Sequence, residues 1–114
     1  MTDLELKHRS DGAAVIIEAV GELDVYTASR LRALTTELAG TARVMILGLG
    51  GVTFIDAAGL AAVFGALRRV RGTGRDLIVV CACEPVLRAL RTAGLLGMLD
   101  IRDTVEAALE AARG

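Results

Sequence analysis

The sequence predicts a single α/β domain: a mixed, mostly parallel β-sheet with an N-terminal antiparallel hairpin and about four packed helices. Two observations predict this fold. Apolar runs of strand length alternate with segments whose apolar residues recur at helical spacing, a pattern typical of parallel sheets covered by helices. The first two runs have no helix between them and are joined by an Asp-Gly pair, which is a strong hairpin signal. A chain of 114 residues is long enough for one domain and too short for two, so we expect the domain to span 1–114.

Composition and charge exclude several function classes. The chain is 54% hydrophobic and 24% charged, which is typical of a globular domain rather than a disordered one. Thirteen basic and fourteen acidic side chains leave a net charge of −1, without the basic surplus of nucleic-acid-binding proteins. The N-terminus alternates charged and apolar residues, unlike a signal peptide, and no apolar run approaches membrane-spanning length. We therefore expect a cytoplasmic protein that neither binds nucleic acid nor inserts into a membrane.

The predicted hairpin consists of strands near residues 4–9 and 15–20. The first strand alternates apolar and polar side chains, and the second is richer in Val and Ile. The only histidine of the sequence, His8, lies in the first strand, where we expect it to face solvent. Gly21 ends the second strand, and residues 22–24 form the next turn.

An amphipathic helix is predicted after this turn, capped by Thr27 or Asp24, and Gly40 is placed to end it. The buried face of this helix is expected to consist of Ala28, Leu31, Leu34, Thr35 and Leu38. The opposite face carries charged side chains, as a surface helix requires.

Residues 43–47 form the third predicted strand. Their apolar run has no polar alternation, so we expect burial on both faces, as in a parallel sheet with helices packed on it. Gly48, Gly50 and Gly51 predict a turn after the strand. The next helix begins near Asp56, whose carboxylate is a preferred N-cap. The buried face of that helix is expected to consist of Leu60, Val63, Phe64, Leu67 and Val70.

The fourth predicted strand, residues 76–83, carries both cysteines. Cys81 and Cys83 would point to the same face of a strand, an arrangement that disfavours a disulfide between them. Two thiolates also fall short of the four ligands that structural zinc sites use. We therefore expect buried, reduced and unreactive cysteines.

Three shorter elements complete the predicted fold. Glu84 and Pro85 open a short helix, since proline suits a first turn. Residues 99–102 predict a short edge strand. Asp103 or Thr104 then caps a last helix.

The sequence lacks the motifs of catalysis and cofactor binding. It contains neither a P-loop nor a dinucleotide-binding glycine motif, and it lacks the Gly-x-Ser-x-Gly of hydrolases. A catalytic triad has no basis here, because the sole histidine lies in the outer hairpin. Free amides at the helix start near Asp56 could bind an anion, but the carboxylate itself would repel it. We therefore expect a protein that is not an enzyme and that uses no cofactor and no metal.

Two short blocks of sequence point to a function. The first is Val-Thr-Phe-Ile-Asp-Ala-Ala-Gly-Leu at residues 52–60, and the second is Gly-Glu-Leu-Asp at residues 21–24, followed by Thr27 and Ala28. The first block resembles the central signature of the STAS family of anti-sigma factor antagonists, typically V-T-F-I-D-S-S-G-L. The second resembles the family's G-E-L-D-x-x-T-A. The blocks occur in the family's order, and the resemblance extends over nearly the whole chain.

The resemblance implies a STAS fold and a protein-binding function. Such antagonists free a sigma factor by occupying its anti-sigma factor, so the expected partner is an anti-sigma factor of the serine-kinase (GHKL) type. A small-molecule ligand is not expected, and a homodimer is left open. The implied partner-binding residues are Asp56, Ala57, Ala58, Gly59 and Leu60, with Glu22 and Asp24 beside them. The small side chains of this turn would let a partner approach the backbone closely.

Two departures from the family pattern affect the expected regulation. In regulated members a serine of the D-S-S-G segment, usually the second, is phosphorylated by the partner kinase; here both positions are alanine, and Ala58 matches the usual phosphoserine. Gly48 stands where the family often has Asp or Asn. The alanines fit an unregulated antagonist, an engineered variant, a switch moved to another residue such as Thr53, or a STAS module with a different task. Such a module would serve as a subunit of a lipid-transport ABC complex or as a scaffold in a signalling assembly.

Overall fold

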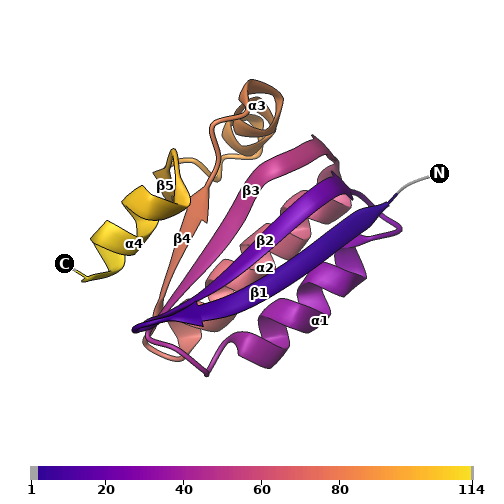
Figure 1. The fold of residues 1–114 in the computed structure, drawn as a ribbon. Helices are drawn as coiled ribbons and strands as arrows, with labels where there is room; N and C mark the ends of the chain where they lie inside the picture. Colours follow the sequence, from indigo (N-terminus) through magenta and orange to yellow (C-terminus); the bar gives the residue numbers. More distant parts are fainter. Residues whose placement is uncertain (1–2, 114) are drawn as a thin grey trace.

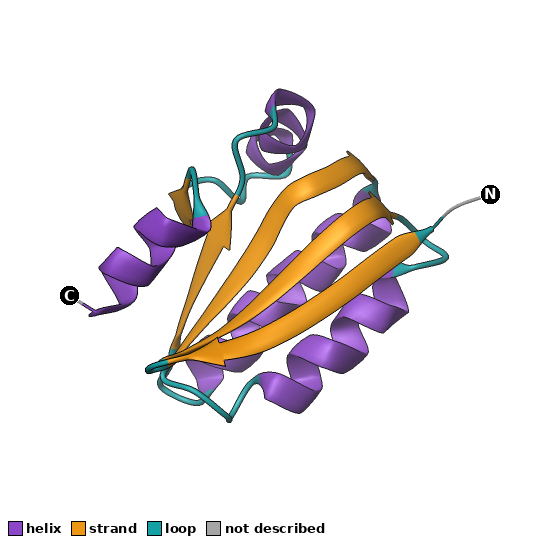
Figure 2. Cartoon of the chain, viewed as in Figure 1, coloured by secondary structure: helices purple, strands orange, loops and turns teal. Residues whose placement is uncertain are grey.

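The computed structural model of the chain describes residues 3–113, which form five strands and four helices (Figure 1; Figure 2). The strands are β1 (Leu4–Asp11), β2 (Ala14–Leu23), β3 (Val44–Ile55), β4 (Asp76–Val80) and β5 (Asp100–Arg102). The helices are α1 (Ala28–Leu38), α2 (Ala57–Gly72), α3 (Glu84–Thr92) and α4 (Val105–Arg113). This alternation of strands and helices confirms the predicted α/β fold.

All five strands belong to one sheet, in the order β1-β2-β3-β4-β5. β1 and β2 form the predicted antiparallel hairpin, and every other pair of neighbours is parallel. The sheet is therefore mixed and mostly parallel, as the sequence predicts. Because a helix connects each parallel pair, the carboxyl ends of β2, β3 and β4 all lie at the same end of the sheet (Figure 1).

The two faces of the sheet are covered unequally. Apolar side chains of α1, α2 and α3 pack against one face and form the main core. The other face is covered by α4 alone, which lies over the β3–β4–β5 side of the sheet (Figure 1). The smaller core under α4 consists of Ala14, Ile16, Val44, Ile46, Ile78, Val80 and Ala108. β3 is buried on both faces over residues 44–49, which its unbroken apolar run predicts.

β2 and β3 are longer than predicted. The expected turn at residues 22–24 begins later than predicted, because β2 continues to Leu23 and the chain turns only from Asp24. The expected turn at residues 48–51 is wrong, because β3 continues through this segment to Ile55. Glycine here allows two strands to approach closely rather than to turn. A Cβ at Gly51 would lie 2.8 Å from Cγ2 of Val20 on β2, and the pairing of the two strands shifts register along this stretch.

β4 is shorter than predicted. Its register with β3 and β5 ends at Val80, and beyond it the N–H of Cys81 still donates to the carbonyl oxygen of Arg102 (3.0 Å). Both cysteines therefore lie in the segment that leads into α3 instead of on a strand. Cys81 is buried, whereas Cys83 is half-buried and is the N-cap residue of α3.

Several predicted boundaries match the structure. Pro85 lies in the first turn of α3. The hydroxyl of Thr104 caps α4, where it accepts a hydrogen bond from the backbone N–H of Ala107 (3.1 Å).

His8 is exposed on β1. Within residues 3–113, every helix is too short or too polar to span a membrane.

Candidate functional site

The two sequence blocks meet at the carboxyl ends of β2 and β3. These strands are parallel neighbours, and Leu23 at the end of β2 pairs with Ile55 at the end of β3. From there the chain continues into the loop before α1 in one case and into α2 in the other (Figure 1). Residues 21–28 and 52–60 are therefore far apart in sequence but form one continuous end of the sheet.

Asp56 joins these two segments through three hydrogen bonds. Its Oδ1 accepts from the backbone N–H groups of Ala58 (2.9 Å) and Gly59 (3.1 Å), which is the N-cap role that the sequence predicts. Its Oδ2 accepts from the N–H of Val25 in the loop before α1 (3.2 Å). A single carboxylate thus satisfies donors from two elements and fixes how α2 sits against the loop.

Asp24 organises the loop before α1 from within. The side chain is only 4% exposed, and its Oδ1 accepts from the N–H groups of Tyr26 (2.9 Å) and Thr27 (3.1 Å). The Thr27 hydroxyl donates to the carbonyl oxygen of Glu22 (2.8 Å) and accepts from the N–H of Asp24 (3.0 Å). Thr27 is the N-cap residue of α1, although its side chain makes no capping bond. The buried carboxylate of Asp24 therefore shapes the loop and is not itself presented at the surface.

Gly59 is a packing position. It is buried, and a Cβ there would lie 2.3 Å from the carbonyl oxygen of Leu23 and 2.8 Å from Cγ1 of Ile55. The same carbonyl oxygen accepts a hydrogen bond from the N–H of Asp56 (3.2 Å). The expectation that Gly59 leaves room for a partner is therefore wrong, because the room is filled by the end of β2.

The other predicted site residues share this end of the sheet but differ in exposure. Ala57 is exposed, while Ala58, Leu60, Glu22 and Asp56 are half-buried. The structure thus brings all of the predicted residues together, with Asp24 and Gly59 beneath the surface and Ala57 the more accessible of the two alanines.

Three large apolar side chains that the sequence reasoning missed lie in the same segments. Tyr26 is 78% exposed, Val25 64% and Phe54 50%. Val25 and Tyr26 fill the unspecified positions of the second block, and Phe54 lies inside the first. Apolar residues in or beside a strand are normally expected in the core, so only the three-dimensional arrangement reveals their exposure. Exposed apolar side chains of this kind are typical of protein-binding surfaces.

A shallow apolar hollow of about 370 Å³ extends along α2 from this end of the sheet. It is lined by Leu60, Ala61, Phe64, Ala93, Leu95 and Met98. Leu60 belongs both to the hollow and to the turn that begins at Asp56. The guanidinium of Arg68 lies over the Phe64 ring, 5.8 Å from its centroid. The hollow therefore continues the apolar surface from the turn onto one side of α2.

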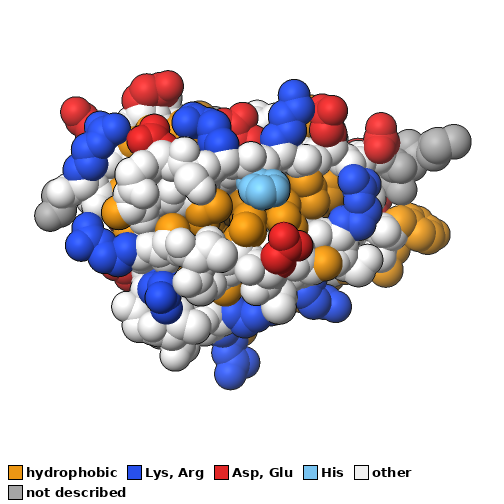
Figure 3. Space-filling view, turned by 60° about the horizontal axis from the view of Figure 1, so that its bottom comes forward, with side chains coloured by type: hydrophobic (Ala, Val, Ile, Leu, Met, Phe, Trp, Pro, Cys, Tyr) orange, Lys and Arg blue, Asp and Glu red, His pale blue; other side chains and the backbone are white. Residues whose placement is uncertain are grey.

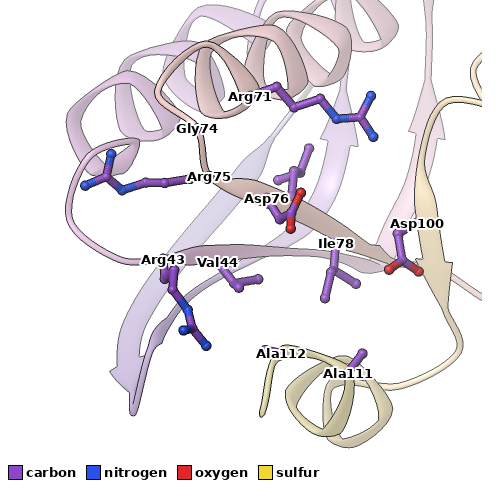
Figure 4. Close-up of a pocket in the computed structure, with 11 residues that line it drawn as sticks. Arg43, Val44, Arg71, Gly74, Arg75, Asp76, Ile78, Asp100, Ala111 and Ala112 are labelled. Atoms are coloured by element: carbon purple, nitrogen blue, oxygen red, sulfur yellow. The ribbon is translucent and has the colours of Figure 1, made fainter. Parts of the chain in front are cut away.

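A larger hollow lies at the opposite, amino end of β3 and β4 and has a different character. Its volume is about 630 Å³, and its charged lining residues are Arg43, Arg71, Arg75, Asp76 and Asp100 (Figure 4). The three guanidinium groups point in different directions, and that of Arg75 points away from Asp76. Arg71 donates to the backbone carbonyl of Met98 (2.8 Å). Because these charges diverge, they do not form a convergent binding site.

Other titratable groups of the described chain are dispersed. Within residues 3–113, no group of three or more His, Cys, Asp or Glu side chains could hold a metal ion. On the face seen in Figure 3, acidic and basic side chains intermingle around His8, so neither sign of charge dominates there. Burial raises the pKa of the Cys81 thiol, which keeps it in its unreactive protonated form. Burial and the nearby Arg32 lower the pKa of Arg69, whose guanidinium donates to the Thr35 hydroxyl (2.8 Å).

Known proteins resemble the chain in sequence and in fold. The family model described as STAS domain matches residues 5–108. A Mycobacterium tuberculosis protein described as a candidate anti-anti-sigma factor is 34% identical over 101 residues, which cover 86% of this chain and 68% of that protein. The anti-sigma-B factor antagonist of Listeria monocytogenes is 27% identical over 101 residues, with 88% of each chain covered. The crystal structure of an anti-sigma factor antagonist from Mycobacterium paratuberculosis matches with a TM-score of 0.91 at 19% identity, over 98% of this chain and 96% of that one.

Proposed function

The chain belongs to the STAS domain family, and we propose that it is an anti-sigma factor antagonist, a regulatory module that occupies an anti-sigma factor and so frees a sigma factor. The names of its curated relatives support this role, because both describe antagonists of this kind. They favour it over a lipid-transporter subunit or a signalling scaffold. The module acts by binding and not by catalysis, and we propose the cytoplasm as its location, since sigma factors act there.

The observation that carries the proposal is the joint surface at the carboxyl ends of β2 and β3. The carboxylate of Asp56 bonds to both segments, and Asp24 fixes the loop from below, so the surface is ordered before any partner arrives. A surface ordered in advance loses less conformational entropy on binding. We define the docking surface as Glu22, Val25, Tyr26, Phe54, Asp56, Ala57, Ala58 and Leu60.

The roles within the docking surface differ. Tyr26, Val25 and Phe54 supply most of the exposed apolar area and are the expected anchors of the contact. Asp56 orients both segments. The small side chains of Ala57 and Ala58 allow a partner to contact the backbone of the first turn of α2. Asp24 and Gly59 act indirectly, by holding the loop and by seating α2 against β2.

The proposed partner is an anti-sigma factor of the serine-kinase (GHKL) type. In regulated relatives such a partner would phosphorylate a serine in the turn, but neither Ala57 nor Ala58 has a hydroxyl. We therefore propose an antagonist that is always competent to bind. Thr53 is the nearest alternative in the first block; it is exposed, and its hydroxyl donates to the carbonyl oxygen of Gly21 (3.3 Å). Phosphorylation of Thr53 would mean that the switch has moved.

The experiment that tests the proposed function is affinity purification of the tagged chain from native cells, with identification of its partners. We expect an anti-sigma factor with a GHKL-type kinase domain to be recovered with the parent chain. Recovery should fall strongly for Tyr26→Ala and stay unchanged for Arg75→Ala, an exchange at the other end of the sheet. Recovery of transporter subunits in place of an anti-sigma factor would contradict the proposal.

A further inference from the structure

β1 is the long free edge of the sheet. It is the first strand in the sheet order and pairs only with β2, and Figure 1 shows no strand beyond it. The opposite edge strand, β5, has only three residues. An edge of eight residues presents a row of backbone N–H and C=O groups that can pair with another strand.

The outward backbone groups belong to the even-numbered residues of β1. The N–H of Glu22 donates to the carbonyl oxygen of Asp3 (2.8 Å), so Asp3 and Glu22 form a hydrogen-bonded pair. Hydrogen-bonded and non-hydrogen-bonded pairs alternate along an antiparallel ladder, so the odd-numbered residues of β1 bond to β2. The N–H and C=O groups of residues 4, 6, 8 and 10 therefore point along the free edge.

The charges on β1 favour a register centred on Leu6 over its neighbours when two copies pair. A two-fold axis makes the two β1 strands antiparallel, and outward backbone groups must meet outward groups, so residues of like parity face each other. With the axis at Leu6, Glu5 of each copy faces Lys7 of the other. Asp3 and Arg9 face each other in the same way. Every charged residue in the paired segment then has an opposite charge across the interface.

Neighbouring registers bring like charges together. An axis at Glu5 or at Lys7 places that residue opposite its own copy. An axis at His8 places Lys7 opposite Arg9. Lys and Arg on an edge strand normally prevent pairing; on β1 they oppose the neighbouring registers and favour the one centred on Leu6.

We propose that two copies of the chain associate through β1 in the register centred on Leu6 and so join their sheets into one. Leu6 is half-buried in each copy, and the two Leu6 residues would meet at the axis. So short a contact is of the size of transient interfaces. β1 is separated from β3 by β2, so the association leaves the Asp56 turn uncovered and reaches the docking surface only beside Glu22, which bonds to Asp3. The inference rests on the edge of the sheet and not on the proposed function.

Sedimentation velocity over a series of concentrations tests the association. The parent chain is expected to show a reversible dimer that weakens at high salt, because exposed charge pairs are screened. A parent chain that remains monomeric at millimolar concentration overturns the inference.

Charge reversal tests the register. Glu5→Lys and Lys7→Glu should each weaken self-association roughly tenfold or more, since every attraction between these two positions becomes a repulsion. An equimolar mixture of the two variants should regain association, because the like charges of one copy then face the opposite charges of the other. A mixture that associates no better than either variant alone excludes this register.

Proline substitution tests the backbone pairing. His8→Pro removes an outward N–H inside the paired segment, whereas Ser10→Pro removes one just outside it. Neither N–H is used within the hairpin, so both variants should keep the native circular dichroism spectrum. The inference expects loss of the dimer for His8→Pro only, and it is overturned if folded His8→Pro dimerises as the parent does.

Discussion

The two ends of the β-sheet carry similar charged residues but arrange them differently. At the carboxyl end, Asp56 and Asp24 each accept several backbone N–H groups and hold two segments together. At the amino end of β3 and β4, Asp76 and three arginines line a larger hollow, but their side chains diverge (Figure 4).

The comparison shows that convergence, not the size of a hollow, marks the candidate site. At the carboxyl end the carboxylates of Asp24 and Asp56 are bonded inside the network, and the large exposed apolar side chains are those of Tyr26, Val25 and Phe54. At the amino end the charged groups stay in contact with water, where opposite charges contribute little. The first end exposes apolar surface, where we propose that a protein docks, and the second exposes charged groups to water.

The largest expected effect comes from filling the space above Gly59. Gly59→Ala should lower the free energy of unfolding by about 3 kcal/mol, because the new Cβ would collide with the backbone oxygen of Leu23, which cannot move aside. Chemical denaturation measures this change. Gly65→Ala is the matched control on the same helix, since its nearest neighbour is the flexible end of Arg69 at 3.2 Å. The control should be neutral or more stable by up to about 1 kcal/mol. An equal loss of stability in both variants would mean that the contact of α2 with β2 at Gly59 does not limit the side chain at this position.

Negative charge at position 58 should have the next largest effect. Ala58→Glu is expected to weaken partner binding about a hundredfold while the domain stays folded, since water screens the new carboxylate from Asp56 in the free domain, whereas a docked partner would bury both charges together. Ala58→Ser should restore phosphorylation by the partner kinase, with loss of binding once the phosphate is added. Ala57→Ser is the control and should stay unphosphorylated. Binding can be measured by calorimetry with and without ATP. Undiminished binding of Ala58→Glu would remove this turn from the docking surface.

Removal of the Asp56 carboxylate should separate binding from stability. Asp56→Ala should cost about 1 kcal/mol of unfolding free energy, the usual value of an N-cap. Its binding loss should be tenfold or more, because the link to Val25 goes as well. Thr104→Ala removes the cap of α4, away from the docking surface, and should cost similar stability with no change in binding. If the two variants lose binding equally, Asp56 is a structural cap only.

Much of this account could be predicted from the sequence, because it rests on local patterns. The parallel strands, the caps at Asp56 and Thr104 and the proline of α3 all follow from short-range chemistry. The extension of β2 and β3 could not be predicted, because glycine has the same signature in a turn and in a strand that a neighbour approaches closely. At Gly51 the deciding partner is Val20, which only the folded chain brings near.

The same holds for the docking surface: local features could be predicted from the sequence, whereas contacts between segments distant in sequence could not. Asp56 was identifiable as a cap, but its bond to Val25 spans two elements and leaves no mark in either segment. The exposure of Tyr26 cannot be predicted, because nothing in the loop sequence states which side chains face water. The packing role of Gly59 cannot be predicted either, because its neighbour in the fold, Leu23, is distant in sequence.

The smallest effect concerns the cysteines, which the structure places after β4. Cys83 should react with a thiol reagent faster than Cys81, because Cys81 is buried and its raised pKa keeps it protonated. Because the folded state disfavours the Cys81 thiolate, Cys81 favours folding at a pH below the ordinary pKa of a thiol. This contribution to stability is lost as the pH rises through the raised pKa of the folded state. Labelling of Cys81→Ser and Cys83→Ser separates the two rates. Equal, rapid labelling of both cysteines in the native protein would show that the segment before α3 opens readily.

The most direct test of the central claim is an amide NMR titration of the labelled chain with its purified anti-sigma factor. The account predicts that the largest signal changes fall on residues 22–26 and 54–60, at the carboxyl ends of β2 and β3. Signals of Arg43, Arg75 and Asp76 at the amino end should stay where they are. Changes concentrated at the amino end, with residues 54–60 unaffected, would contradict the claim that the docking surface lies at the Asp56 turn.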